Sequence, residues 1–411
     1  MRPGVACAFL LLVVLGAAAA FAQGERTGMS RAEAYARADA LSRLGRELFF
    51  DPRLSASGRM SCASCHDPQH AFSPANDLPV QFGGRDMKQP GLRAVPSLKY
   101  LQVVPQFTEH FFESDDEGDS SIDNGPTGGL TWDGRVDRHR DQARVPLLSP
   151  FEMANAAPAD AVARLRGTGY VRQFQALYGP TIFEDDDRAF AAIGEALAVF
   201  QEDARSFYPY SSKYDAYLAG RVPLTAQESR GLALFESPAK GNCANCHRSQ
   251  PSNDGTPPQF TDYGLIALGL PRNAAIAANA DPTFFDLGAC GPLRSDLAGR
   301  KQYCGLFRTP TLRNVALRRT FFHNGLVHDL KQAVAFYVER DTNPGKWYPR
   351  AADGSVRKFD DLPAPYRNNV NKEPPFGARP GNRPALTEAE IDDIVAFLGT
   401  LTDGYDAPPR R

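Results

Sequence analysis

The sequence predicts a mainly α-helical protein with long ordered loops, and three observations support this fold class. Apolar residues recur at helical spacing in several separate segments of the chain. No segment alternates polar and apolar residues over the length of a strand. The chain also contains 33 prolines and 35 glycines, which interrupt helices and favour extended connections between them.

Five helices are expected in order along the chain. The first begins at Ser30, a preferred N-cap residue, with Glu33 three positions later. The last two begin at Thr225 and Thr387, each followed three residues later by Glu, which is the signature of a capping box. The predicted segments are residues 30–50, 160–177 and 187–202, and the two that start at the threonines.

Two short strings carry the strongest chemical signal. Cys62-Ala63-Ser64-Cys65-His66 and Cys243-Ala244-Asn245-Cys246-His247 both follow the C-x-x-C-H pattern of covalent c-type haem attachment. Two thiols one turn apart add to the vinyl groups of one porphyrin, and the adjacent His binds the iron. The strings therefore predict two covalently bound haem c groups, with His66 and His247 as iron ligands.

A zinc site is the alternative interpretation, because two C-x-x-C pairs can supply four thiolates. A His directly after both pairs, and the long separation between them, favour haem.

One motif in each half of the chain predicts two cytochrome c-like haem domains, residues 23–208 and 209–411. The boundary is placed where Pro209 and Gly220 interrupt the helical pattern.

The first 22 residues have the pattern of a cleavable export signal. Arg2 precedes an apolar run that ends in Ala20-Phe21-Ala22, which matches a charged start, an apolar core and a small-residue cleavage site. We therefore expect residues 1–22 to be a signal peptide and the protein to be periplasmic, where haem c is attached. A retained membrane anchor is the alternative, but the run is short for a span, so no stable membrane insertion is expected.

Charge and the remaining cysteines add further expectations. A formal net charge of −2 argues against nucleic acid as a partner.

Cys290 and Cys304 remain after the haem motifs and the signal peptide, and in an oxidising compartment they are predicted to form a disulfide; two buried free thiols are the alternative. The acidic segment 109–129 is expected to be a solvated loop, with a docking patch for a basic redox partner as the sharper alternative.

The ligand opposite each iron-binding His decides what a haem can do. Two strong axial ligands produce an electron carrier, whereas an open face binds peroxide or oxygen. None of the five methionines follows Met153, so the second haem has no methionine ligand from its own domain. Its candidates are His323, His328 and Tyr337, or no ligand at all.

The first haem has no strong candidate for a second ligand. His70 lies only four residues after His66, too near to pass round the porphyrin edge, and is expected to make a local hydrogen bond. His110 and His139 are not excluded. An open face on the first haem is the preferred interpretation.

Beyond the haem motifs, the chain resembles the bacterial di-haem cytochrome c peroxidase and MauG superfamily over nearly all of its predicted mature length. The strings Trp132-Asp133-Gly134-Arg135, Gln142-Ala143 and Phe151-Glu152-Met153 carry this resemblance, with the Gln and Glu ten and twenty residues after the Trp. Two later strings agree with it, Phe307-Arg308-Thr309-Pro310-Thr311-Leu312-Arg313-Asn314 and Phe322-His323-Asn324-Gly325.

The resemblance implies a role for each of the three matched side chains. Trp132 would lie between the haems and carry an electron from the second to the first. Gln142 would hold the bound peroxide by a hydrogen bond. Glu152 would act as the acid–base residue that moves a proton between the peroxide oxygens.

Two departures from the ordinary peroxidases point to MauG-like members. Tyr337 lies fourteen residues after His323, where ordinary members carry Met and MauG carries Tyr, so the resemblance implies that Tyr337 ligates the second iron. On spacing alone it would be a core aromatic residue. Phe82, sixteen residues after His66, replaces a switchable His, which implies an open first haem without prior reduction.

Two further departures leave features open. The family's inter-haem calcium takes an Asn side chain in an Arg-Asn-x-Pro string, but this chain has Arg93-Ala94-Val95-Pro96, so calcium binding is left open. His139 replaces an apolar residue, and either enters the first pocket or lies behind it.

The resemblance implies a periplasmic di-haem peroxidase that reduces hydrogen peroxide with electrons from a small cytochrome c or cupredoxin. A MauG-like enzyme that oxidises a Trp or Tyr side chain of a protein substrate is the first alternative. A non-catalytic di-haem electron carrier is the second, and it requires two axial ligands at both irons. The lack of a credible second ligand beside His66 counts against the carrier.

Overall fold

The structure is a computed structural model that describes residues 28–113 and 119–406. The chain divides into two compact units, residues 1–40 and 41–411. The described part of the first unit is mostly the first half of helix α2 (Arg31–Phe50). The Ser30 backbone amide donates to Glu33 Oε2 at 2.7 Å, and the Glu33 amide donates to Ser30 Oγ at 3.3 Å, which confirms the predicted cap. The predicted signal peptide, residues 1–22, lies outside the described residues.

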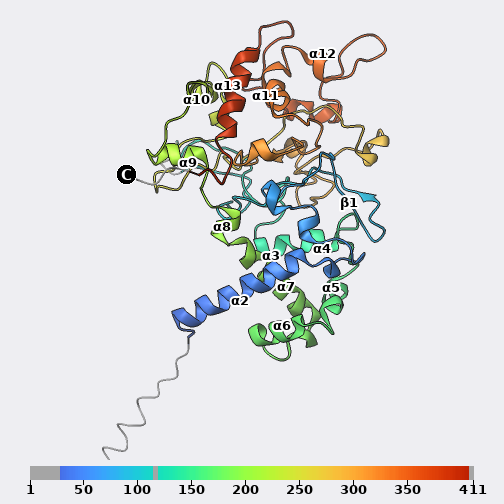
Figure 1. Cartoon of the computed structure of the whole chain (residues 1–411). Coiled ribbons are helices and arrows are strands. Elements are labelled where there is room, and N and C mark those ends of the chain that lie inside the picture. Colours follow the sequence, from blue (N-terminus) through green and yellow to red (C-terminus); the bar gives the residue numbers. More distant parts are fainter. Residues whose placement is uncertain (1–27, 114–118, 407–411) are drawn as a thin grey trace, which may run out of the picture. The chain divides into compact units, whose positions relative to one another are not determined.

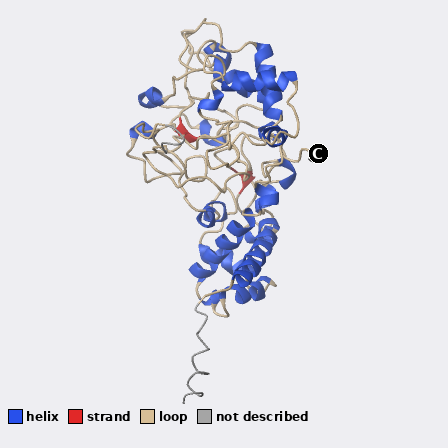
Figure 2. Cartoon of the chain, turned by 90° about the vertical axis from the view of Figure 1, so that its left-hand side faces the viewer, coloured by secondary structure: helices blue, strands red, loops and turns tan. Residues whose placement is uncertain are grey.

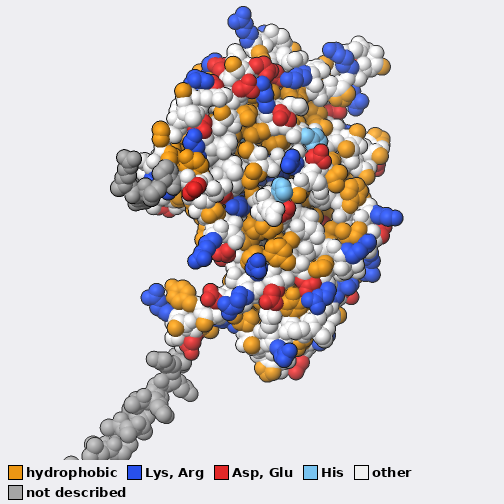
Figure 3. All heavy atoms as spheres, in the orientation of Figure 1, with side chains coloured by type: hydrophobic (Ala, Val, Ile, Leu, Met, Phe, Trp, Pro, Cys, Tyr) orange, Lys and Arg blue, Asp and Glu red, His pale blue; other side chains and the backbone are white. Residues whose placement is uncertain are grey.

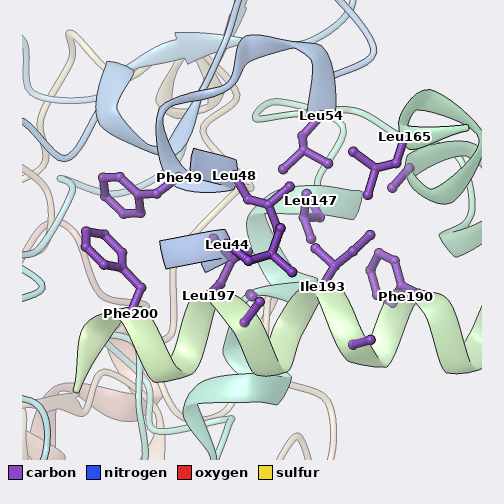
Figure 4. Close-up of a cluster of buried hydrophobic side chains, with 14 of the residues drawn as sticks. Leu44, Leu48, Phe49, Leu54, Leu147, Leu165, Phe190, Ile193, Leu197 and Phe200 are labelled. Atoms are coloured by element: carbon purple, nitrogen blue, oxygen red, sulfur yellow. The ribbon is translucent and has the colours of Figure 1, made fainter. Parts of the chain in front are cut away.

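Helices of the earlier half of the chain pack round one large hydrophobic cluster in the second unit. The apolar face of α7 contributes Phe190, Ile193, Leu197 and Phe200, which lie against the end of α2 (Figure 4). These helices are α3 (His139–Gln142), α4 (Arg144–Leu148), α5 (Pro158–Leu165), α6 (Tyr170–Tyr178), α7 (Asp186–Gln201) and α8 (Ala204–Phe207).

One predicted helix is wrong in part. The segment 160–177 contains two helices, α5 and α6, because the chain leaves helical geometry at Arg166, where ψ is 138°. Gly167 follows with a φ of +77°, a left-handed conformation that favours glycine and stops an α-helix. The apolar pattern continues across this break because both helices bury residues in the same cluster.

A second hydrophobic cluster is built by helices of the later half of the chain. Both predicted capping boxes are present, since Thr225 accepts from the Glu228 amide and Thr387 accepts from the Glu390 amide. Figure 1 shows α10, α11 and α13 lying together. The helices are α9 (Lys213–Leu218), α10 (Ala226–Glu236), α11 (Leu330–Glu339), α12 (Pro344–Trp347) and α13 (Glu388–Gly399).

Sheet is minimal within the described residues, and loops join the helices (Figure 2). Strand β1 (Phe82–Gly83) pairs antiparallel with β2 (Gln89–Pro90), and β3 (Leu265–Ile266) pairs antiparallel with β4 (Phe307–Arg308). Single 3-10 turns lie between the helices, and two of them, Cys62–Ser64 and Cys243–Asn245, carry the haem motifs. The mainly α fold class is confirmed.

The two clusters divide the chain near the predicted domain boundary. Buried members of the first run from Leu41 to Phe207, and those of the second from Tyr214 to Leu401. The assignment of residues 23–208 and 209–411 to separate haem domains stays a prediction.

The predicted disulfide between Cys290 and Cys304 is present, with the Cα atoms 4.9 Å apart.

The surface is mixed in charge. On the face that Figure 3 shows, acidic and basic side chains are interspersed with apolar ones, as the small net charge of −2 would suggest. Of the helices in the described ranges 28–113 and 119–406, none is both long enough and apolar enough to cross a membrane.

Gly231 sets how closely α10 and α13 approach. A Cβ at this position would lie 2.0 Å from the Asp393 carbonyl oxygen, so the helices would have to separate. We expect Gly231→Ala to lower the free energy of unfolding by about 2–3 kcal/mol, measured by urea denaturation of the haem-loaded protein. Gly399→Ala, within exposed space on α13, is the control and should be neutral or slightly stabilising. Equal effects of the two substitutions would contradict the packing role of Gly231.

Candidate functional site

The first C-x-x-C-H string folds into a compact turn that directs its reactive groups to one cavity. The His66 backbone amide donates to the Cys62 carbonyl at 2.9 Å. Cys62, Cys65 and His66 all line a cavity of about 540 Å³, and both thiols are free. The turn therefore presents two thiols and one imidazole to the same space.

A single hydrogen bond sets the protonation of the His66 ring. Nδ1 lies 2.9 Å from the Phe72 carbonyl oxygen, which can only accept, so Nδ1 carries the proton and Nε2 keeps its lone pair. Burial lowers the pKa of His66 to about 4, so the ring is neutral at physiological pH. A neutral imidazole with a free Nε2 is the form that binds a metal ion.

The second string repeats this arrangement in detail. The His247 amide donates to the Cys243 carbonyl at 2.8 Å, and His247 Nδ1 lies 2.9 Å from the Phe260 carbonyl oxygen. Burial lowers the pKa of His247 as well. Cys243, Cys246 and His247 line a second cavity, of about 200 Å³.

Both carbonyl groups that accept from the His rings belong to strained residues. Phe72 has a φ of +52° and Phe260 a φ of +54°, which is uncommon for a residue with a side chain. Phe72 stacks on Phe207 with ring centroids 4.2 Å apart, and Phe260 packs edge-on against Tyr214 at 5.4 Å. The aromatic core thus holds each carbonyl in position beside its His.

The donor sets fit two covalently attached haems. Each cavity combines two free thiols, a neutral imidazole and largely apolar walls, as c-type attachment requires.

Arg308 also fits the presence of haem, because it lines both cavities and its Nε donates to the Thr131 carbonyl at 3.2 Å. Burial lowers its pKa only to about 10, so it remains a cation, and among the described residues no carboxylate pairs with it. The carboxylate groups of a haem would supply the missing counter-charge.

The three side chains expected to act on peroxide all reach the first cavity. Trp132, Gln142 and Glu152 line it together with the first haem motif. Helix α3 places Gln142 at its last residue, and a turn in which the Glu152 amide donates to the Ser149 carbonyl at 3.1 Å follows α4. The fold therefore brings together residues that are ten and twenty positions apart in the sequence.

Glu152 lies in a position suited to proton transfer. Burial raises the pKa of its carboxyl group, and within the described ranges no Lys, Arg or His is close enough to form an ion pair with it. A carboxyl group with a raised pKa and no paired cation holds a proton more readily than a solvated one, which suits it to accept and return a proton.

The other side chains near the first haem motif take varied positions. Phe82 lines the cavity and is 47% exposed, so it lies at the opening to solvent. Met60 and Met153 also line it, but both are buried in the first hydrophobic cluster. His70 Nδ1 pairs with Asp67 Oδ2 at 2.9 Å, which confirms the expected local hydrogen bond. His139 bonds the Leu101 carbonyl at 3.1 Å and lies behind the cavity wall.

Trp132 borders both cavities. Its Nε1 donates to the Ala94 carbonyl at 2.7 Å, and its own carbonyl accepts from the Arg308 amide at 2.7 Å. Next to it, Asp133 is fully buried and pairs with Arg93 at 2.7 Å. These contacts hold the indole between the two cavities.

Tyr337 and His323 both reach the second cavity, whereas His328 is exposed and lies outside it. Burial raises the pKa of the Tyr337 phenol, and the nearby Cys246 and Cys243 thiols add to the effect. Its ring stacks on Phe376 at 5.5 Å. His323 instead lies flat on Phe307, with ring centroids 3.5 Å apart.

Sequence reasoning missed two arginines that line these cavities, buried Arg308 and half-buried Arg318. Arg308 lies in one of the strings that carry the resemblance, but its residue type alone does not distinguish a surface cation from a buried one. Arg318 also lines the second cavity, and no motif marked it. The only signal available was the placement of both residues between apolar segments, which is a weak one.

Comparison with known proteins identifies the family. The family profile described as di-haem cytochrome c peroxidase matches residues 39–222. The methylamine utilization protein MauG of Paracoccus denitrificans is 34% identical over 378 residues, which cover 89% of each chain. Cytochrome c551 peroxidase of Nitrosomonas europaea is 27% identical over 72% of this chain and 71% of that protein. The solved structure of the di-haem peroxidase BthA from Burkholderia thailandensis superimposes with a TM-score of 0.78 at 41% identity, covering 88% of this chain and 86% of that one. The chain is therefore a member of the di-haem cytochrome c peroxidase and MauG family, whose members include oxidoreductases that act on peroxide.

Proposed function

We propose that this protein is a periplasmic di-haem peroxidase that reduces hydrogen peroxide with electrons from a small cytochrome c or cupredoxin. The observation that carries the proposal is the convergence of Trp132, Gln142 and Glu152 on the cavity of the first haem motif. This arrangement supplies a proton-transfer group, a hydrogen-bond donor and a link to the second cavity in one space. Cys62, Cys65 and His66 would hold the first haem, which would supply an iron that reacts with peroxide.

The chain's own residues then account for the proton movements. Glu152 accepts a proton from one peroxide oxygen and returns it to the departing oxygen, which leaves as water. Its raised pKa suits it to both tasks, because the carboxyl group can hold the proton between them. Gln142 donates an amide hydrogen bond that orients the substrate.

Trp132 and Tyr337 are proposed to connect the two haems electronically. Trp132 borders both cavities, so its indole shortens the path for an electron. Tyr337 is proposed to ligate the second iron. Burial disfavours its phenolate, but a ferric ion bound at the oxygen would reverse that preference, as metal ions do for their ligands. An anionic oxygen ligand lowers the potential of the iron it binds.

A second candidate function is supported by specific residues. Tyr337 and Phe82 occupy the positions at which the sequence departs from ordinary peroxidases towards MauG, and MauG of Paracoccus denitrificans is 34% identical to this chain. In that case the electrons would come from a Trp or Tyr side chain of a protein substrate. A non-catalytic electron carrier fits less well, because the first cavity contains a proton-transfer group that a carrier does not need.

One assay separates these functions. Stopped-flow mixing of the oxidised protein with hydrogen peroxide, with and without reduced cytochrome c, measures reaction and turnover. Fast catalytic oxidation of the cytochrome supports the peroxidase. Fast reaction with peroxide but no turnover of cytochrome c or cupredoxin supports the MauG-like enzyme, and no reaction with peroxide supports the carrier.

We expect Glu152→Gln to slow the reaction with peroxide by more than about a hundredfold, because the amide cannot accept the proton. The wild-type rate should fall as pH drops through the raised pKa of Glu152, where the base becomes protonated, and the variant should lack this limb. Stopped-flow absorption across a pH series measures both effects. Glu184→Gln, at an exposed position, is the control. An unchanged rate in Glu152→Gln would remove this residue from the mechanism.

Tyr337→Phe should change the absorption and EPR spectra of the second haem while the first haem still reacts with peroxide, because only the oxygen ligand is lost. The oxidised protein is compared with wild type and with Tyr405→Phe, which alters a tyrosine that is 38% exposed. If the spectrum of the second haem matches wild type, Tyr337 is not its ligand, and His323 becomes the remaining candidate in that cavity.

A further inference from the structure

The segment from Arg93 to Ser97 runs between the two cavities. Ala94 and Val95 line the first cavity, whereas Pro96 and Ser97 line both. The Ala94 amide donates to the His323 carbonyl at 2.7 Å. This segment is also where the family resemblance would place an Asn ligand for calcium, and here the residue is Ala94.

The guanidinium of Arg318 lies against this segment. Its Nη2 donates to the Val95 carbonyl at 3.2 Å, its Nη1 to Ser73 Oγ at 3.3 Å, and its Nε to the Thr320 carbonyl at 3.2 Å. Val95 and Ser73 belong to the earlier half of the chain and Thr320 to the later half. One cation thus holds three segments together beside the cavities.

The partners of Arg318 are all neutral oxygen atoms. Arg313 and Arg340 instead pair with a carboxylate, Arg313 with Asp215 at 2.9 Å and Arg340 with Asp341 at 2.6 Å, whereas Arg308, like Arg318, donates to a neutral carbonyl. Arg318 has no carboxylate partner among the residues that the structure describes. Backbone carbonyl oxygens, two of which accept from this half-buried guanidinium, are also among the ligands that bind calcium ions in proteins.

The positive charge of Arg318 persists at physiological pH and reaches the first haem site. Burial lowers its pKa to about 10, which still leaves it protonated. The charge also contributes to the lowered pKa of His66, after burial. Arg318 therefore supplies a fixed positive charge next to the first haem motif.

A calcium ion does not fit this place. Ala94 offers no side-chain oxygen, and the Val95 and Thr320 carbonyls already accept from the guanidinium. Within residues 28–113 and 119–406, no three His, Cys, Asp or Glu side chains form a cluster that could hold a metal ion. A divalent cation would also be repelled by the guanidinium at short range.

We propose that Arg318 takes the place of an inter-haem calcium ion in this protein, which consequently neither binds nor requires calcium between its haems. The guanidinium supplies the positive charge and the cross-link between chain segments that a calcium ion would otherwise provide. The inference holds for either of the proposed enzymatic functions.

The first test uses the unmodified haem-loaded protein. We expect elemental analysis to find calcium far below one ion per chain, before and after dialysis against EGTA. Added calcium or EGTA should leave the melting temperature and the EPR spectrum of both haems unchanged. One tightly bound calcium per chain, or a spectrum that changes when calcium is removed, would overturn the proposal.

The second test exchanges the cation. Arg318→Ala should lower the melting temperature by about 5 °C or more, since three partly buried oxygen atoms lose their donor, and calcium should not restore it. The double variant Arg318→Ala with Ala94→Asn should bind calcium and regain part of the lost melting temperature when calcium is added. Arg319→Ala, at the neighbouring exposed position, is the matched control and should behave as wild type.

A double variant that folds but never binds calcium would overturn the assignment of Arg318 to a calcium position. If Arg318→Ala does not fold, Arg318→Lys keeps the charge with fewer directed donors, and it should melt below wild type and bind no calcium. A Lys variant that melts like wild type and acquires calcium would contradict the proposal. Elemental analysis and EPR report on these outcomes independently of catalytic activity.

Discussion

The hydrogen bond between a His ring and a backbone carbonyl is the contact on which both candidate haem sites depend. At His66 and His247 the bond to Nδ1 is 2.9 Å long, and it fixes both the orientation of the ring and the atom that can bind iron. Phe72 and Phe260 supply these carbonyls from left-handed backbone conformations, which cost about 1–2 kcal/mol each. The aromatic contacts of the two hydrophobic clusters offset this strain, so the core of each half positions its own cofactor site.

The distribution of buried charge distinguishes the space between the cavities from the rest of the protein. Arg313 and Arg340 are paired with carboxylates, whereas Arg308 and Arg318 are surrounded by neutral oxygens and open to the cavities. Unpaired buried cations are costly unless an anion is provided. Positive charge is thus concentrated where two anionic cofactors would lie close together.

The two cavities differ in size and in the side chains that line them, and the difference fits separate roles for the two haem sites. The first is larger, opens to solvent beside Phe82 and contains a carboxyl group with a raised pKa. The second is smaller, and Tyr337 enters it from α11. This difference is consistent with the proposal that substrate reacts at the first site and that Tyr337 ligates a cofactor at the second. Trp132 is the aromatic side chain with access to both.

Local patterns in the sequence alone determined the haem motifs and the capping boxes at Thr225 and Thr387. Each cap and motif works because its partners lie within a few residues. The candidate set Trp132, Gln142 and Glu152 came from the resemblance to a family, which its ten-residue spacing matches. Only the tertiary structure decided that the helix predicted over residues 160–177 breaks at Gly167, that His139 lies behind the cavity, and that half-buried Arg318 lines the second cavity. Arg318 contacts a residue 245 positions away, and no local pattern can report the environment of a side chain whose neighbours come from such distant segments.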